Sequence, residues 1–83
     1  MRIKVRLFGL LRAAVADPEG RLEVTAPEGT DVAGLIAWLA RERSSSLFDA
    51  RACLAVVDGT RVPLSLVLEE GQEVGLYHTF SGG

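Results

Sequence analysis

A single amphipathic helix, set between stretches that alternate like strands, is the feature of this sequence that most constrains its fold. Four apolar residues fall at positions i, i+3, i+4 and i+7 and therefore lie on one side of a helix: Val32, Leu35, Ile36 and Leu39. Thr30 or Asp31 can cap the start of this helix with a side-chain oxygen, and the serines at 44–46 follow its end. The apolar side needs a partner, so we expect the helix to lie across a sheet.

Two strands are predicted before the helix. Residues 2–8 and 21–26 place charged or polar side chains between regularly spaced apolar ones, which is typical of strands with one face in a core. The turn-forming residues at 17–20 join them into a hairpin-like pair. The short apolar stretch at 10–15 is expected to form one or two helical turns.

Three strands are predicted after the helix, and the first two form a hairpin. Residues 52–57 are all apolar, which is typical of a buried strand. Asp58 and Gly59 follow, and this pair favours a type I′ hairpin turn because both central residues of that turn need positive φ. Residues 60–62 then return as a short strand, which Pro63 places at an edge of the sheet.

The remaining segments complete the sheet. Residues 64–68 are expected to pack over the core, and residues 73–77 form a last strand. If that strand returns to the middle of the sheet beside the first one, the order ββαβββ makes an α+β fold of the β-grasp (ubiquitin-like) type. We therefore predict a mixed sheet with one main helix packed across it over residues 1–77, and a flexible, extended C-terminal tail over residues 78–83 that ends in Gly-Gly.

The inward members of these patterns predict the core between helix and sheet, which should contain Ile3, Val5, Leu7, Val24, Leu35, Ile36, Leu39, Val56 and Val74. Trp38 flanks the helical stripe and is expected to pack there. Cys53 opens a buried strand and is interpreted as a small core residue, because free cysteines are usually buried. Neither residue is assigned a chemical role.

Composition excludes several classes of function. The 83 residues fit one domain, with a net charge of −2 and nine basic residues that form no cluster, so nucleic acid is not an expected partner. No apolar run approaches the roughly 20 residues of a membrane span, and the N-terminus does not resemble a signal peptide, so we expect a cytoplasmic protein that does not bind membranes. One Cys and one His are too few for a metal site or for a nucleophile with its base, and we expect no autonomous enzyme.

The reactive group that remains is the C-terminal carboxylate. It follows Gly82 and Gly83, which have no side chains and can enter a narrow channel in another protein. Residues 79–83 would reach about 16–18 Å when extended. A carboxylate lacks a leaving group, so it must first be activated. Coupling to AMP gives a mixed anhydride, from which a sulfur nucleophile can displace AMP to leave a terminal thiocarboxylate.

Four segments resemble the small subunit of molybdopterin synthase: IKVRLFG at 3–9 with the following Leu11-Arg12, GTDVAGL at 29–35, LEEGQEV at 68–74 and the terminal Ser-Gly-Gly. That β-grasp family is related to the thiamine-pathway sulfur carrier and to ubiquitin. The resemblance implies adenylation of Gly83 by an E1-like enzyme that uses ATP, conversion to a thiocarboxylate with a sulfurtransferase, and sulfur delivery to cyclic pyranopterin monophosphate. Catalysis is then expected in the large subunit, and no permanently bound cofactor is expected in this chain.

The predicted site residues lie at the end of the chain. Gly83 is the group to be adenylated and thiocarboxylated, and Gly82, Ser81, Phe80 and Tyr77 are expected to bind partners. Phe80 has no core of its own to join and is therefore a candidate anchor in a partner's pocket. His78 is interpreted as an exposed tail residue. The segment 78–80, His-Thr-Phe, stands where the family often has Pro-Pro and Val.

Other functions remain open at this stage. The chain could be a ubiquitin-like modifier joined through Gly83 to lysines of other proteins, or a sulfur carrier for thiamine, cysteine or tRNA thiolation. It could also be a β-grasp interaction module with an inert tail. The first two classes share an acyl-adenylate, whereas the third predicts that deletion of Gly82 and Gly83 changes nothing.

Overall fold

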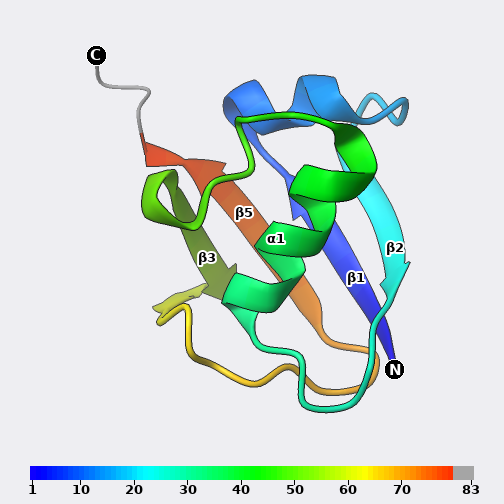
Figure 1. Ribbon diagram of the computed structural model, residues 1–83, viewed down its shortest axis with the longest axis vertical. Coiled ribbons are helices and arrows are strands. Elements are labelled where there is room, and N and C mark those ends of the chain that lie inside the picture. Colours follow the sequence, from blue (N-terminus) through cyan, green and yellow to red (C-terminus); the bar gives the residue numbers. More distant parts are fainter. Residues whose placement is uncertain (80–83) are drawn as a thin grey trace.

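The computed structural model describes residues 1–79, so the predictions that concern Phe80, Ser81, Gly82 and Gly83 lie outside the described residues. Figure 1 shows a sheet with one long helix, α1, crossing one of its faces. The elements in chain order are β1 (Arg2–Leu7), the 3-10 helix η1 (Gly9–Ala14), β2 (Arg21–Thr25), α1 (Val32–Arg43), the 3-10 helix η2 (Ala50–Ala52), β3 (Cys53–Val57), β4 (Thr60–Val62) and β5 (Glu73–His78).

The strands form one mixed sheet in the order β2-β1-β5-β3-β4. The last strand lies in the middle, parallel to β1 and antiparallel to β3, whereas β1 and β2 form an antiparallel hairpin. This arrangement confirms the predicted β-grasp fold with one main helix. It also holds β5 on both sides by backbone hydrogen bonds, so the strand that leads into the C-terminal tail has a fixed position in the sheet.

Residues with positive φ form the turns of the two hairpins. Gly20 closes the connection into β2 with a φ of 76°, and a Cβ on it would collide with the backbone oxygen of Leu7. Asp58 and Gly59 both have positive φ, 52° and 77°, as the predicted type I′ turn requires. The strand that follows this turn, β4, lies at the edge of the sheet as Pro63 indicated.

Helix α1 begins and ends at the predicted signals. The Asp31 carboxylate caps its start by accepting a hydrogen bond from the Gly34 N–H at 2.8 Å. Ser44 ends the helix in the left-handed conformation, with a φ of 49°. The predicted apolar stripe is fully buried against the sheet: Val32, Leu35, Ile36 and Leu39.

The core lies between α1 and the sheet and contains eight of the nine predicted residues. The prediction for Val56 is wrong, because the buried positions of β3 are Cys53, Ala55 and Val57. Side chains alternate along a strand, so Val56 lies half-buried on the opposite face. Cys53 is buried and Trp38 packs against the core, as expected.

Strand β5 continues one residue beyond the predicted end, to His78. His78 pairs with Cys53 of β3 and is half-buried, so it is not the exposed tail residue that we expected. The described part of the tail is therefore Thr79 alone. Among residues 1–79, no helix has the length and apolar character needed to cross a membrane.

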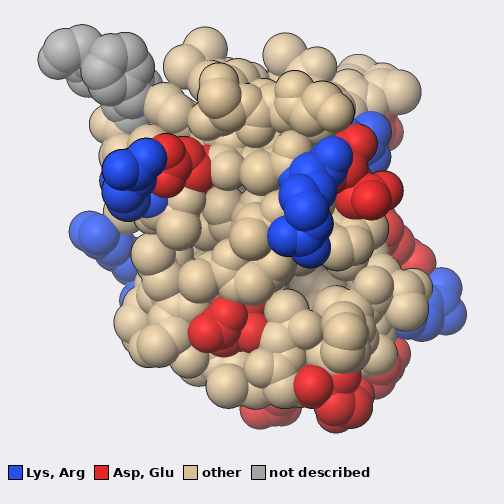
Figure 2. Space-filling view, viewed as in Figure 1, with Lys and Arg blue, Asp and Glu red and all other residues tan. Residues whose placement is uncertain are grey.

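The charged side chains on the helix-covered face are scattered. Figure 2 shows Lys and Arg side chains beside Asp and Glu on this face, with wide neutral areas between them. Two of the ion pairs in the molecule join exposed arginines to nearby carboxylates, Arg21 to Glu19 and Arg51 to Asp49. No basic patch for nucleic acid is visible on this side of the protein.

Candidate functional site

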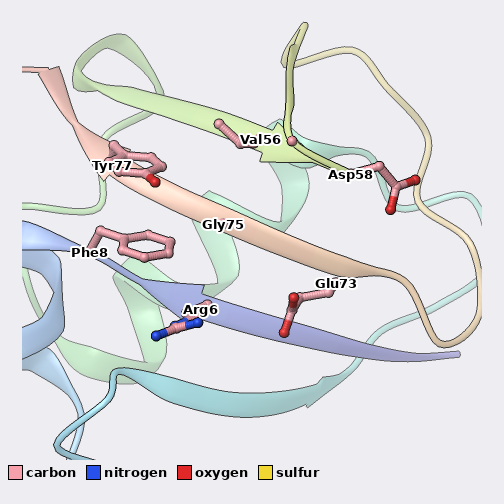
Figure 3. A pocket seen from close by; sticks show the side chains of 8 residues that line it. Arg6, Phe8, Val56, Asp58, Glu73, Gly75 and Tyr77 are labelled. Carbon is pink, nitrogen blue, oxygen red and sulfur yellow. The ribbon is translucent and has the colours of Figure 1, made fainter.

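The face of the sheet opposite α1 carries a group of aromatic and charged side chains beside the start of the tail. Alternation places Arg6, Val56 and Tyr77 on this side, and Phe8, just after β1, joins them (Figure 3). Tyr77 is 40% exposed, which is unusual for a large apolar side chain on a central strand. We call this surface the open face.

Two stacked rings form the centre of the open face. The rings of Phe8 and Tyr77 are nearly parallel, with an interplanar angle of 5° and centroids 4.4 Å apart. The backbone sets this geometry, because the Phe8 N–H donates a hydrogen bond to the Leu76 carbonyl at 3.1 Å and so prolongs the β1–β5 pairing. Such a pair contributes about 0.5–1.5 kcal/mol beyond its buried area.

Gly75 makes room for the stack. It lies between Val56 of β3 and Arg6 of β1, and a Cβ on it would be 3.1 Å from Cε2 of Phe8. That distance is tighter than an ordinary carbon contact, so any side chain at position 75 would push the Phe8 ring outward. The absence of a side chain in the middle of β5 therefore lets the ring lie over the strand.

A cavity of about 190 Å³ opens over this glycine, lined by Arg6, Phe8, Val56, Asp58, Gly59, Glu73, Gly75 and Tyr77. The Arg6 guanidinium lies over the Phe8 ring, with Cζ 5.2 Å from the ring centroid. Its Nε is buried and has no hydrogen-bond partner among residues 1–79. Figure 3 shows Arg6 on the side of the two rings, whereas Glu73 and Asp58 lie towards the opposite end.

A second, larger cavity of about 420 Å³ lies at the start of the tail. Its lining includes Thr79, the two arginines Arg51 and Arg61, and Cys53. Hydrogen bonds from Arg51 to the Asp49 carboxylate, one of 3.0 Å from its guanidinium, lower the pKa of Asp49 below its ordinary value. The tail therefore leaves the sheet beside two arginines, of which Arg51 is paired with the Asp49 carboxylate.

Cys53 does not behave as a reactive group in this setting. Its Sγ donates a hydrogen bond to the Leu47 carbonyl at 3.5 Å, and burial raises the pKa of the thiol. The thiolate, which is the nucleophile, is disfavoured. No group of His, Cys, Asp or Glu side chains that could hold a metal ion occurs within residues 1–79.

Of the predicted site residues, the structure places Tyr77 on the open face and leaves Phe80, Ser81, Gly82 and Gly83 beyond the described range. Sequence reasoning missed Arg6, Phe8 and Gly75. One signal could have revealed Phe8, because it continues the solvent-facing series of Arg2, Lys4 and Arg6 and is therefore an aromatic residue on the outward side of a strand.

The model of the ThiS family matches residues 5–83, which is nearly the whole chain. No curated protein sequence matches it.

Solved structures share the fold at low sequence identity. A Pyrococcus furiosus protein proposed to be subunit 1 of molybdopterin converting factor is 24% identical, with a TM-score of 0.71 and coverage of 93% of this chain and 95% of that one. SAMP1 from Haloferax volcanii is 18% identical, with a TM-score of 0.76 and full coverage of both chains. A chain from the complex of subunits 1 and 2 of molybdopterin-converting factor from Helicobacter pylori is 22% identical, with a TM-score of 0.64 and full coverage of both.

Proposed function

Because the chain belongs to the ThiS family of ubiquitin-fold sulfur carriers, we propose that it carries sulfur as a thiocarboxylate on Gly83 and donates it to cyclic pyranopterin monophosphate. The recipient site is then in the large subunit of molybdopterin synthase, and the product is molybdopterin. In this proposal the chain itself is not an enzyme. It supplies the sulfur, and its partners supply the catalysis.

The observation that carries this proposal is the position of β5. This strand lies between β1 and β3 in the sheet and bears the exposed Tyr77, and the segment that follows it from Thr79 ends in Gly82 and Gly83. A partner that docks on the open face is therefore beside the start of the arm that carries the carboxylate. Fixed placement of a reacting group matters, because misplacement by about 1 Å can cost on the order of a hundredfold in rate.

Conversion of the Gly83 carboxylate to a thiocarboxylate takes two steps. A Gly83 carboxylate oxygen attacks the α-phosphate of ATP in the E1-like adenylating enzyme, pyrophosphate leaves, and an acyl-adenylate forms. A hydrosulfide ion then attacks the acyl carbon, AMP leaves with the electrons of the broken C–O bond, the S–H proton is released to water, and the terminal group becomes –COS⁻. No redox change occurs at the glycine, and ATP is consumed by the activating enzyme rather than held by this chain.

Two similarities support the choice of partner. The Pyrococcus furiosus protein is proposed to be subunit 1 of molybdopterin converting factor, and the Helicobacter pylori structure is a complex of subunits 1 and 2 of that factor. By analogy, we propose that the open face and the tail of this chain dock on a large subunit. Tyr77, Phe80, Ser81 and Gly82 are proposed to make the contacts, all within the cytoplasm.

A second candidate is a protein modifier joined through Gly83 to lysines. The similarity to the small archaeal modifier protein SAMP1, with a TM-score of 0.76, supports this second candidate. Carriers for thiamine, cysteine or tRNA thiolation share the same activated tail and differ only in the recipient of the sulfur.

The test combines mass spectrometry with reconstitution. The chain is incubated with the adenylating enzyme, ATP and sodium sulfide, and we expect its C-terminal peptide to gain the mass difference between sulfur and oxygen. Addition of the large subunit and the pterin precursor should then yield molybdopterin. A chain lacking Gly83 is the matched control and should fold normally but give neither product.

Three outcomes would separate the alternatives. Thiocarboxylate without molybdopterin would reject the pathway but keep the carrier chemistry. High-mass conjugates in protein purified from its source would favour the modifier. Sulfur transfer by the chain that lacks Gly83 would reject the carboxylate as the working group.

A further inference from the structure

Lys4 is the only lysine among these 83 residues, and the other basic side chains are all arginines. The guanidinium of arginine stays protonated at neutral pH and does not attack an acyl carbon, whereas the amine of lysine attacks once it has lost its proton. We infer that Lys4 is an acceptor site for the activated Gly83 of a second copy of this chain, with which it forms an isopeptide bond. This inference rests on the proposed function, because a carboxylate that has not been activated does not react with an amine.

The amine of Lys4 is open to an approaching group. Lys4 is exposed on the outward side of β1, and its ammonium makes no ion pair within residues 1–79. The side chain lines a cavity of about 200 Å³ that it shares with Arg21, Glu23 and Glu73. An acyl group can therefore reach the Lys4 nitrogen without displacing a bonded partner.

The other nucleophiles that the structure describes are less available. The α-amino group of Met1 donates a hydrogen bond of 2.7 Å to the Ala26 carbonyl and lies 3.9 Å from a carboxylate oxygen of Glu28. It is part-buried at the end of the β1–β2 pairing, so an acyl group would have to separate it from the sheet. The Cys53 thiol is buried and its pKa is raised. Among these groups, Lys4 is therefore the preferred acceptor.

Two carboxylates flank Lys4 in the sheet. The strand register places Glu23 of β2 opposite it on one side and Glu73 of β5 opposite it on the other. Glu23 is paired with Arg2 at 3.0 Å, whereas Glu73 makes no ion pair within residues 1–79. Figure 3 shows the Glu73 side chain reaching from β5 towards β1. Because neighbouring strands lie about 4.8 Å apart, the Glu73 carboxylate is placed to accept a proton from the Lys4 nitrogen.

Acyl transfer to Lys4 needs no co-reactant beyond the activated tail. The neutral amine of Lys4 attacks the acyl carbon of the Gly83 adenylate, and a C–N bond forms. The nitrogen then loses a proton to Glu73, and AMP leaves with the electrons of the broken C–O bond. The product is an amide, and no atom is oxidised or reduced.

Strand geometry favours the tail of a second copy over the tail of the same molecule. Lys4 lies beside Glu73, the first residue of β5, whereas the tail follows His78, the last. These two ends of β5 are about 17 Å apart at the usual rise of a strand. A tail that reaches about 16–18 Å when extended would have to reverse and run back along the whole strand. A second copy meets no such limit.

The test is a conjugation reaction without a sulfur source. The chain, in large excess over the adenylating enzyme, is incubated with ATP and analysed by denaturing gel and by mass spectrometry of its peptides. We expect a species with the mass of two chains less one water, in which Gly83 is bonded to Nζ of Lys4. Lys4→Arg keeps the charge but removes the amine, and it should lower the yield of this species at least about tenfold.

Two variants test whether the surroundings of Lys4 matter. The double variant Lys4→Arg with Arg43→Lys moves the single lysine to an exposed position on α1, and it should also give at least about tenfold less conjugate than wild type. Glu73→Gln keeps the lysine and should lower the rate of conjugation about tenfold or more. Wild-type yield from the double variant, or a wild-type rate for Glu73→Gln, overturns the inference.

ATP–pyrophosphate exchange provides a separate readout of the proposed function. Exchange by each variant at the wild-type rate shows that the variant folds and that its Gly83 is still adenylated. If the wild-type chain supports exchange but gives no conjugate, a link to the Met1 nitrogen or a cyclised single chain, the inference is wrong and the carrier function stands. If the wild-type chain supports no exchange, the proposed function fails and the inference fails with it.

Discussion

Substitution of Gly75 by Ala should weaken docking on the open face while it leaves the free energy of unfolding nearly unchanged. The added Cβ would lie 3.1 Å from Cε2 of Phe8, and the ring must move by a few tenths of an ångström. The movement weakens the Phe8–Tyr77 stack, whose value is about 0.5–1.5 kcal/mol. Alanine restricts the unfolded chain more than glycine does, and this favours folding by roughly 0.5–1 kcal/mol within a strand.

The two effects nearly cancel, so Gly75→Ala should change the free energy of unfolding by less than about 1 kcal/mol. Docking should respond more strongly, because the added Cβ occupies part of the cavity and the displaced Phe8 ring shifts against the Arg6 guanidinium that lies over it. We expect the Kd for the large subunit to rise about tenfold, an effect comparable with that of other central interface side chains.

Urea unfolding and calorimetry measure the two quantities on the same protein samples. Gly34→Ala is the matched control, because its Cβ would also be tight, 3.2 Å from Asp31 Oδ1, but at the start of α1 away from the open face. It should leave the Kd unchanged. Two results would show that Gly75 does not make room for a docking surface. One is a Gly75→Ala variant that binds as tightly as wild type, and the other is a decrease of more than about 3 kcal/mol in its free energy of unfolding.

The remaining predictions concern the core, the thiol and the tail. Leu39→Ala should lower the free energy of unfolding by about 2–5 kcal/mol, because Leu39 is fully buried in the helical stripe, and an unchanged urea midpoint would contradict this. Cys53 should react with iodoacetamide much more slowly in the native protein than in urea near neutral pH, since burial raises the pKa of its thiol; equal rates would show that the site is open. Phe80→Ala should weaken binding of the large subunit by about 1 kcal/mol or more with the same unfolding midpoint, and equal affinity in calorimetry would remove Phe80 from the site.

The parts of the fold that were predicted correctly depend on local signals. The apolar spacing from Val32 to Leu39 and the carboxylate of Asp31 determine where α1 begins and which side it buries, through interactions within a few residues of each other. Asp58 and Gly59 specify their turn in the same way. Alternation in β1 is equally local, because charged residues mark its outward side.

The prediction of buried residues and strand ends was wrong where the local sequence carries no signal. The run from Cys53 to Val57 is apolar throughout, so nothing in it shows which of its residues face the helix. Pairing with β5 decides the matter, and it places Val56 opposite Gly75 on the open face. The sequence likewise places His78 in the tail, whereas pairing with Cys53 makes it the last residue of β5.

By itself, the sequence determined the order of the elements, the buried stripe of the helix, the turns and the diglycine end. Only the tertiary structure decided that Phe8 stacks on Tyr77 and that Arg6 lies over the Phe8 ring beside Gly75. The reason is that β1 and β5 come from opposite ends of the chain, and their register is set by backbone hydrogen bonds between them rather than by any local preference.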